Sequence, residues 1–511
     1  MKFLSKFLAI FFIFTILFSC KQKESSTKAY ETESDTEVIA MTTPVNAKLP
    51  VDVKPTCVVS SSDLSNWFVS GSITENGAVH PANSVTFGHK NNCDFYKWSE
   101  QMFLWMTSPS EGDNYTNGTI FESPVFYTVS PKVNGQRTLI PHEQGKLISA
   151  VANTQKNDSL VDTEEGQATD DVLMDQNGSL LYYITMVNDV YAEFLTGVDN
   201  GELSGKEFPT TATALDSIVD YAAQRGVTLS DPNALTIEVK TSWTEVDNLS
   251  NADSYITIDA IVPTYEKTDS IWTPNGSKET KLAMLGLHIV GSTNGHPEMV
   301  WATFEHTNNA PNLSYGYVDS SGETKTVAAD TGNDWLLNSD SSSSDYNQSH
   351  MTYTNSNGSI QAKKGLSISA SNSTKTKPWG VAEAGVPNPE NATGAESNTQ
   401  VLSINNSVLG QLLGNDIRKN YVFIGATWTD GGAGPNGESY SVTNTTPGVA
   451  IGTSQLANST METYAQNGTA YSKGFGTCFA CHSNNGSLAP KDISHVFDEI
   501  QPLFSATESN R

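Results

Sequence analysis

The sequence predicts an α+β fold, in which a β-rich body with a largely antiparallel sheet and a few packed helices is followed by a short helical C-terminal segment. Segments rich in β-branched and aromatic residues follow one another closely between residues 235 and 306, each bounded by Asn, Gly or Pro. The chain also combines 37% apolar residues with 17% charged residues and many Asn, Ser, Thr and Gly, which is typical of a β-rich extracytoplasmic protein. We therefore expect the sheet to be the largest structural element.

Periodicity predicts the individual elements. Helical spacing of apolar residues predicts a helix at 93–107, whose Phe95, Trp98, Met102 and Trp105 form a stripe typical of a core-facing surface, with a cofactor-contacting wall as the alternative. Further helices are expected at 211–225, 401–420 and 454–466. Alternation predicts strands at 66–70, 120–129, 180–187, 235–243, 254–263, 281–293, 298–306 and 421–428, of which the fourth to the seventh are expected to share one antiparallel sheet.

Composition divides the chain into five parts. Residues 1–19 form a leader, and 20–50 form a polar tether that has no apolar periodicity and is expected to be disordered. The β-rich body follows at 51–311. Residues 312–400 are a loop-rich linker or insertion, because Ser, Asn, Thr and Gly dominate much of this stretch. The last part, 401–511, is expected to pack on the body.

The leader indicates export. Lys2 and Lys6 precede an apolar run over 7–18, which is the pattern of a secretory signal and is shorter than the roughly 20 residues that cross a bilayer. The run ends in Leu-Phe-Ser-Cys, which resembles the cleavage motif of bacterial lipoproteins. We therefore expect Cys20 to be lipidated, so that the protein is anchored in a membrane of the cell envelope, on the periplasmic or the cell-surface face.

Cys478, Cys481 and His482 form the sequence Cys-x-x-Cys-His, which is the attachment signature of a c-type haem. Two thiols one helical turn apart can bond to the two vinyl groups of one porphyrin, and the adjoining imidazole then lies beneath the iron as proximal ligand. The alternatives are a redox disulfide and half of a zinc site. A structural zinc site needs two more ligands at ordered spacing, and only His495 follows. The sequence therefore predicts one covalent haem c in a short cytochrome c-like segment.

The two remaining cysteines are Cys57 and Cys93. Because disulfides persist in an oxidising envelope compartment, we predict a bridge between them that closes the N-terminal part of the fold. Two buried free thiols are the alternative.

The sixth ligand of the iron is expected to come from upstream. Only 29 residues follow His482 and none is Met, so the segment cannot be a self-contained small cytochrome c. The first candidate is His306 and the second is His288, both on predicted strands, where an ordinary core histidine is the alternative for each. His495 and Met461 are further candidates. An open, five-coordinate iron is also compatible with the sequence and would permit small-ligand chemistry.

Charge limits the partners. The chain carries 29 Lys and Arg against 56 Asp and Glu, a net charge of −27 at pH 7. So acidic a surface repels polyanions, which excludes nucleic acid as a partner, and it favours a basic redox partner protein or cationic electron carrier.

Several segments together resemble a group of exported bacterial lipoproteins identified only as cytochrome c family proteins. They include Trp98–Pro109, Ile237–Trp243, Leu285–Ser292, Val300–Pro311 and Leu456–Ser483. The resemblance covers most of the mature chain and implies haem binding by Cys478, Cys481 and His482, but it implies no particular reaction.

These observations favour an envelope lipoprotein that transfers single electrons through its haem. A haem-dependent oxidoreductase with an open iron site is the neighbouring alternative. The competing class is a surface lipoprotein that binds a ligand such as a glycan, for which exposed Trp272, Trp335 and Trp379 would serve as binding surfaces. Buried tryptophan is the commoner case.

Overall fold

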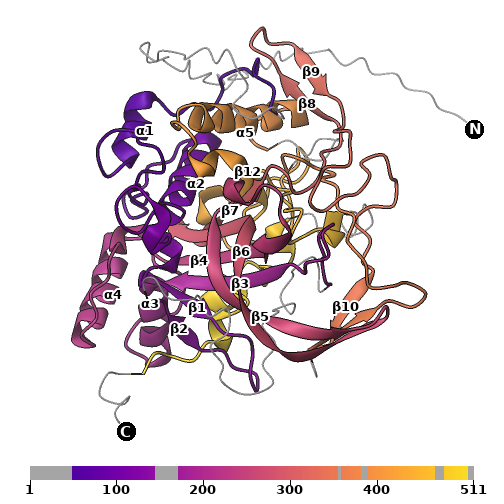
Figure 1. Cartoon of the computed structure of the whole chain (residues 1–511). Helices are drawn as coiled ribbons and strands as arrows, with labels where there is room; N and C mark the ends of the chain where they lie inside the picture. The colour runs from indigo at the N-terminus through magenta and orange to yellow at the C-terminus, as the bar shows by residue number, and fades with distance from the viewer. Residues whose placement is uncertain (1–48, 144–170, 355–357, 381–387, 467–476, 505–511) are drawn as a thin grey trace, which may run out of the picture. The chain divides into compact units, whose positions relative to one another are not determined.

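The computed structural model describes residues 49–143, 171–354, 358–380, 388–466 and 477–504, and a β-sheet of eleven strands is its largest element (Figure 1). The leader and Cys20 lie outside the described residues. Among the described helices none is both long and apolar enough to span a membrane. The strands are β1 (Phe126–Val129), β2 (Leu139–Pro141), β3 (Tyr182–Asn188), β4 (Ile237–Glu245), β5 (Thr257–Lys267), β6 (Ile271–Thr293), β7 (His296–His306), β8 (Tyr315–Val318), β9 (Thr324–Val327), β10 (Met351–Thr354), β11 (Ser359–Ala362), β12 (Tyr421–Thr429) and β13 (Ala450–Gly452).

The strand order is β13-β12-β7-β6-β4-β3-β1-β2, and neighbouring strands run antiparallel, which confirms the predicted largely antiparallel sheet. Strands β4 to β7 confirm the four segments that were expected to share it. Strand β6 begins at Ile271, earlier than the expected residue 281, and its first half pairs with β5 and β11. That half is mostly exposed and polar, so it carries no apolar pattern that would predict a strand.

The helices among the described residues are α1 (Ser61–Trp67), α2 (Asn92–Met106), α3 (Asp189–Asp199), α4 (Ala212–Gln224), α5 (Gly394–Leu409) and α7 (Pro490–Ile493). Helix α2 confirms the helix expected at 93–107, and a capping box between Asn91 and Asp94 begins it. Helix α4 confirms the helix expected at 211–225.

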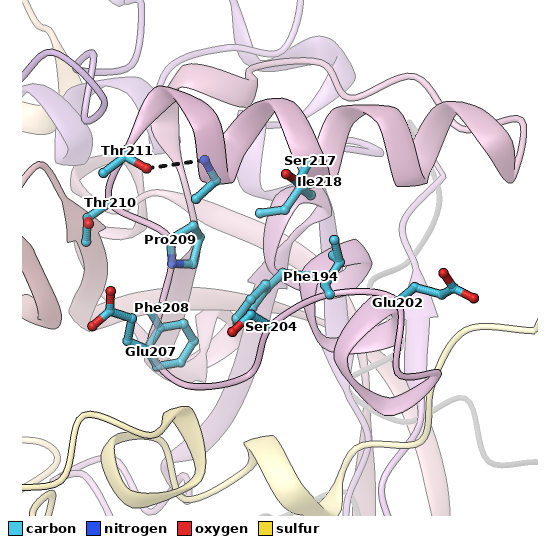
Figure 2. A pocket seen from close by; sticks show the side chains of 12 residues that line it. Phe194, Glu202, Ser204, Glu207, Phe208, Pro209, Thr210, Thr211, Ser217 and Ile218 are labelled. Carbon is cyan, nitrogen blue, oxygen red and sulfur yellow. Dashed lines mark hydrogen bonds between the residues drawn. The ribbon is translucent and has the colours of Figure 1, made fainter.

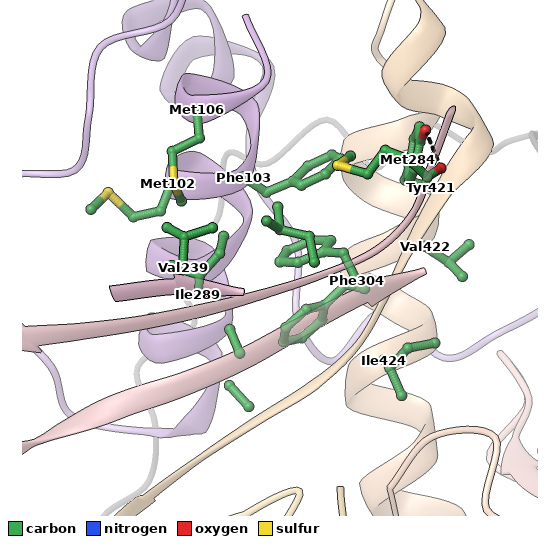
Figure 3. Close-up of a cluster of buried hydrophobic side chains, with 14 of the residues drawn as sticks. Met102, Phe103, Met106, Val239, Met284, Ile289, Phe304, Tyr421, Val422 and Ile424 are labelled. Atoms are coloured by element: carbon green, nitrogen blue, oxygen red, sulfur yellow. Dashed lines mark hydrogen bonds between the residues drawn. The ribbon is translucent and has the colours of Figure 1, made fainter. Parts of the chain in front are cut away.

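Helix α2 packs on one face of the sheet (Figure 3). Its Met102 and Phe103 meet Ile289 of β6 and Phe304 of β7, and the rings of Phe103 and Phe304 stack with centroids 4.3 Å apart. Helix α5 covers the same face beside β12. The stripe formed by Phe95, Trp98, Met102 and Trp105 is buried in this cluster and is therefore core.

Helices α3 and α4 and the C-terminal segment cover the other face, because successive residues of a strand point to opposite sides. Trp301 of β7 belongs to this second cluster, whereas its neighbours Val300 and Ala302 belong to the first. Phe194 of α3 contacts Phe497 near the C-terminus, with ring centroids 5.9 Å apart. The second face is therefore the one that meets the haem signature.

Several predicted elements are wrong in type or extent. Residues 66–70 were expected as a strand, but the first two of them are the end of helix α1. The side chain of Ser60 stabilises the start of this helix by accepting from the N–H of Asp63. The strand expected at 120–129 is confirmed only in β1, since its first residues form a 3₁₀ turn over Ile120–Glu122. Helix α5 starts before the expected 401–420, because Thr393 and Glu396 form a capping box, and it ends at Leu409, well before residue 420.

The helix expected at 454–466 is absent from the described structure except for a 3₁₀ turn at Tyr464–Gln466. Side chains compete with the helical pattern there: the N–H of Asn458 donates to Glu462 over 2.8 Å, and the N–H of Ser459 donates to Glu305 over 2.6 Å. This stretch is thereby held against strand β7 by polar contacts.

A disulfide joins Cys57 to Cys93, with their Cα atoms 5.4 Å apart. It connects the segment that precedes α1 to the first turn of α2. The same segment is bonded to α5, where the N–H of Cys57 donates to the hydroxyl of Ser403 over 3.0 Å. The beginning of the body is thereby attached to two helices that pack on the first face of the sheet.

Candidate functional site

The haem signature forms one tight turn at the surface of the second face. Residues Cys478–Ala480 are a 3₁₀ helix, and Thr477 caps it by accepting from the N–H of Ala480 over 3.1 Å. The N–H of His482 donates to the carbonyl of Cys478 over 3.0 Å. The two cysteines therefore lie one turn apart, with Cys478 half-buried and Cys481 exposed. Residues 467–476, which precede this turn, lie outside the described residues.

His482 is held in one orientation. Its Nδ1 lies 2.9 Å from the carbonyl oxygen of Ile493. Because a carbonyl can only accept, Nδ1 carries the proton, and Nε2 of the neutral imidazole presents a lone pair. Burial, the neighbouring His495 and other nearby cations lower the pKa of His482 well below its ordinary value, which keeps the ring neutral. A metal-binding imidazole has this arrangement, with one nitrogen fixed by a carbonyl and the other available.

Aromatic rings support His482 on two sides. The ring of His495 stacks on it with centroids 3.9 Å apart and an angle of 14° between the planes. The indole of Trp301 lies 4.3 Å from it, also measured between centroids. Trp301 additionally contacts Phe479 inside the motif, with centroids 5.8 Å apart. The motif is thus packed directly on strand β7.

Apolar and polar contacts fix the rest of the segment. Phe479, Ile493 and Phe497 are buried in the cluster on the second face. The hydroxyl of Ser494 donates to Glu238 of β4 over 2.7 Å. Further along, Arg137, which is 1% exposed, donates to Glu499 over 2.9 Å. The segment is therefore joined to the body at several points.

The pKa of the Cys478 thiol is shifted by its surroundings. Burial, and to a lesser extent the charge of Glu462, raise its pKa well above the ordinary value. Cysteines that act in thiol–disulfide exchange have lowered pKa values. The surroundings of Cys478 are thus unlike those of a redox-active dithiol.

His288 lies on the second face, near the motif. It pairs with Lys240 of β4 and Thr303 of β7, and its Nε2 is 2.9 Å from Oε1 of Glu462. Burial raises the pKa of Glu462, but the charge of His288 and their hydrogen bond outweigh burial, so that the pKa is lowered overall. The two side chains therefore form a hydrogen-bonded contact close to the haem signature.

His306 lies on the first face and is separated from the motif by the sheet. Its ring stacks on Tyr255 with centroids 3.8 Å apart, and its Nε2 is 3.1 Å from the carbonyl oxygen of Ser254. Its Nδ1 accepts from the N–H of Asn308 over 3.2 Å. His306 lies five positions after Trp301 on one strand, an odd offset, so the two side chains point to opposite faces. The first candidate for the sixth ligand is therefore a core histidine whose two ring nitrogens are both hydrogen-bonded.

The other candidates also differ in position. Nε2 of His495 is 3.2 Å from the carbonyl oxygen of Cys481, and its ring lies face to face with that of His482, so it neighbours the proximal imidazole and does not oppose it. Met461 is fully buried in a third cluster with Leu285 and Tyr183. His495 therefore contacts the motif from beside the proximal imidazole, and Met461 belongs to the core.

The three tryptophans of the glycan-binding alternative are buried. The exposed fractions are 8% for Trp272, 8% for Trp335 and 3% for Trp379. The expectation that they form an exposed binding surface is therefore wrong, because each indole contributes to the apolar core or its border.

The motif residues fit a covalently attached haem. Two thiols on one turn, one exposed and one half-buried, and an imidazole whose Nε2 has no hydrogen-bond partner within the described residues are the groups that this cofactor uses. Cys478 and Cys481 would hold the porphyrin, and His482 would hold the iron. No group of three or more His, Cys, Asp and Glu residues suited to another metal is found in the described part of the chain.

A pocket of about 270 Å³ lies between α3 and α4 (Figure 2). Phe194, Phe208 and Ile218 form its apolar side, and Glu202 and Glu207 are at its rim. It is slightly smaller than the roughly 300–1,000 Å³ of typical ligand pockets and contains no residue of the motif. The haem signature therefore lies outside this pocket.

The sequence reasoning missed the residues that surround the motif. Trp301 packs on His482, Glu462 contacts His288, and the backbone carbonyl of Ile493 contacts Nδ1 of His482. These roles depend on contacts between segments that are distant in the sequence. Alternation on 298–306 does indicate that Trp301 and His306 face opposite sides. It does not indicate which side the C-terminal segment covers.

Comparison with known protein families, curated protein sequences and solved structures gave no match.

Proposed function

We propose that this protein is a lipid-anchored envelope protein that carries one covalent haem c and transfers single electrons. The observation that carries the proposal is the orientation of His482, whose Nδ1 is bonded to the Ile493 carbonyl next to two cysteines on one turn. A single tuned iron is sufficient for electron transfer. The resemblance to exported cytochrome c family lipoproteins supports the same proposal.

The haem, when bound, supplies an iron that alternates between two oxidation states. The chain contributes orientation and a dry environment. Ile493 fixes the tautomer of His482 and Trp301 limits rotation of its ring, so the ligand needs little rearrangement when the charge of the iron changes. The buried cluster of Phe479, Ile493 and Phe497 excludes water from one side of the motif. Such burial is one of the properties that set a haem potential.

The partner is proposed to be basic. With a net charge of −27, the acidic surface attracts a positively charged redox protein or electron carrier and repels nucleic acid. Cys481 and His495 are both exposed, so an edge of the site is open to such a partner.

A haem-dependent oxidoreductase with an open iron site is the second candidate, and one observation favours it. His288 faces the motif, but its Nε2 is engaged with Glu462 at 2.9 Å. Unless this contact is exchanged for the iron, the sixth position stays open to a small ligand. This candidate shares the haem and the ligand His482 and differs only in the sixth position.

An absorption spectrum distinguishes the candidates. The full chain is matured with haem-attachment machinery and recorded oxidised, reduced and with carbon monoxide. Electron transfer predicts six-coordinate low-spin iron that does not bind carbon monoxide, and an open site predicts binding. The Cys478→Ser/Cys481→Ser variant is expected to lose covalent haem while His80→Gln, a change at an exposed histidine, retains it. A wild-type chain that matures without haem under these conditions would contradict both candidates.

A further inference from the structure

Two histidines from distant parts of the chain meet beside the first turn of α2. His89 precedes α2 and His296 begins β7, and their Nε2 atoms lie 3.1 Å apart. His296 is 2% exposed, whereas His89 is only half-buried. The pair is therefore internal on one side and reachable from solvent on the other.

A buried carboxylate orients His296. Nδ1 of His296 is 2.8 Å from Oε1 of Glu298, and the same oxygen accepts from the N–H of Thr429 over 3.0 Å. Because an ionised carboxylate can only accept, the proton of the neutral imidazole lies on Nδ1, and Nε2 presents a lone pair toward His89. A carboxylate that orients an imidazole in this way is the usual partner of a metal-ligating histidine.

Glu298 is a buried carboxyl group. Its side chain is 0% exposed, and among the described residues its carboxyl group contacts the imidazole of His296 and forms no ion pair with Lys or Arg. Its Oε2 is buried and has no hydrogen-bond partner among the described residues. A buried carboxylate is otherwise costly, and in proteins it is paired with a cation or placed beside a metal. A cation bound at Nε2 of His296 would offset this negative charge through the imidazole ring, whose Nδ1 contacts Glu298.

The contact between the two imidazoles is itself incomplete. If His89 carries its proton on Nε2, it donates to His296, but its own Nδ1 is left bare, and this atom is buried without a hydrogen-bond partner in the described structure. If the proton is on Nδ1, two lone pairs face each other at 3.1 Å. A cation between the two nitrogens removes the repulsion in the second arrangement, because both lone pairs then coordinate it.

The distance suits a tetrahedral ion. A zinc ion held about 2.05 Å from each nitrogen places two ligands 3.1 Å apart at an angle of about 100°, close to the tetrahedral value. Aromatic rings enclose the position: Phe95 lies 4.9 Å from His89 and 5.0 Å from His296 between centroids, and it stacks on Trp428 at 3.9 Å. These walls shield the inner side and fix both imidazoles.

We propose that His89 and His296 bind a divalent transition-metal ion, with Zn²⁺ as the representative, and that Glu298 positions His296 from behind. Imidazole is a suitable ligand for zinc, copper and nickel. Two protein ligands leave further positions for water or a small ligand, so the site is open and binds metal less tightly than a four-ligand structural site. This proposal is independent of the haem, since no residue of the Cys-x-x-Cys-His motif takes part.

The test is a zinc-binding measurement on the full chain, with zinc counted per chain after equilibrium dialysis. The Cys478→Ser/Cys481→Ser background removes the thiols as competing ligands, so the outcome does not depend on whether haem is attached. We expect one zinc equivalent in this background. His89→Gln and His296→Gln should each abolish it, and Glu298→Gln should weaken the affinity about 10–100-fold. His80→Gln, which changes an exposed histidine, is the matched control and should leave binding unchanged.

X-ray absorption on the zinc-loaded protein identifies the ligands directly. It therefore does not require the histidine variants to fold. A shell of nitrogen and oxygen ligands that includes two imidazoles supports the proposal. No bound zinc in this background, or unchanged binding in both His89→Gln and His296→Gln, overturns it and leaves the pair as a simple hydrogen-bonded contact.

Discussion

Nε2 of His288 lies 2.9 Å from Oε1 of Glu462, on the face of the sheet that carries the haem signature. His306, five positions after Trp301 on the neighbouring strand, faces the other side of the sheet, where its ring centroid lies 5.2 Å from that of Tyr421 in the first cluster. This difference reverses the order of the two upstream candidates for the sixth ligand.

We expect His288→Ala to convert a low-spin haem spectrum to a high-spin one without loss of covalent haem. His306→Ala should leave the spectrum unchanged, because its ring contacts Tyr255 and the Ser254 carbonyl and does not reach the motif. Absorption spectra of both variants provide the measurement. If His495→Ala alone produces the conversion, the ligand comes from the C-terminal segment itself, and the upstream sheet is not involved.

Removing the bridge between Cys57 and Cys93 should destabilise the protein. The two residues are 36 positions apart, for which the chain-entropy model gives about 4 kcal/mol at 25 °C. Chemical denaturation of Cys57→Ala/Cys93→Ala against the wild type measures the loss. Thiol labelling of denatured, unreduced protein should modify neither cysteine, and labelling of both would exclude the bridge in the mature protein.

Lipidation of Cys20 is a prediction of the sequence, because this residue lies outside the described structure. Mass analysis of the mature N-terminus should find a modified Cys20 as the first residue. In Cys20→Ser the protein should appear in the soluble fraction of the envelope. An unmodified N-terminus downstream of Cys20 is the outcome incompatible with this anchor.

Glu100 should make the stability fall as the pH rises. Its side chain in α2 is 2% exposed, and burial raises its pKa from 4.5 to about 8. The folded protein therefore keeps this proton between pH 4.5 and 8, whereas the unfolded chain loses it above pH 4.5, so stability is lost across that window. The full loss above pH 8 is on the order of 5 kcal/mol.

Glu100→Gln removes the titration, so its free energy of unfolding should exceed that of the wild type at pH 8.5 and approach it at pH 4.5. Denaturation curves at both pH values measure this difference. Glu266→Gln, which changes an exposed carboxyl on β5, is the matched control. A difference of equal size at both pH values would falsify the assignment of the effect to ionisation.

Much of the sheet could be predicted because strands β4 to β7 carry strong local signals, namely β-branched residues and bounding turn residues. Elements that depend on a capping side chain or on a contact with a distant segment could not be predicted from the local sequence. Helix α1 depends on the Ser60 cap, and the stretch near Ser459 is held by Glu305, 154 positions earlier in the chain. Propensity does not report such contacts.

The candidate site was predictable only in its covalent chemistry. Cys478, Cys481 and His482 stand at a spacing that the porphyrin itself imposes, so one stretch of sequence identifies them. Trp301, Glu462 and the His89–His296 pair come together only when remote segments pack. Their chemistry is thus a property of the fold and is not visible in any single stretch.

The segment that precedes α1 cannot reach its folded position until α5 has been synthesised, because it is hydrogen-bonded to that helix. The N–H of Cys57 and the hydroxyl of Ser403 are 346 positions apart, and β12, which lies beside β7 in the sheet, is synthesised later still. Contacts of such separation form slowly and only after the intervening chain is present. For the export that the leader predicts, translocation must therefore be nearly finished before the body can close, and the unfolded chain needs protection from aggregation until then.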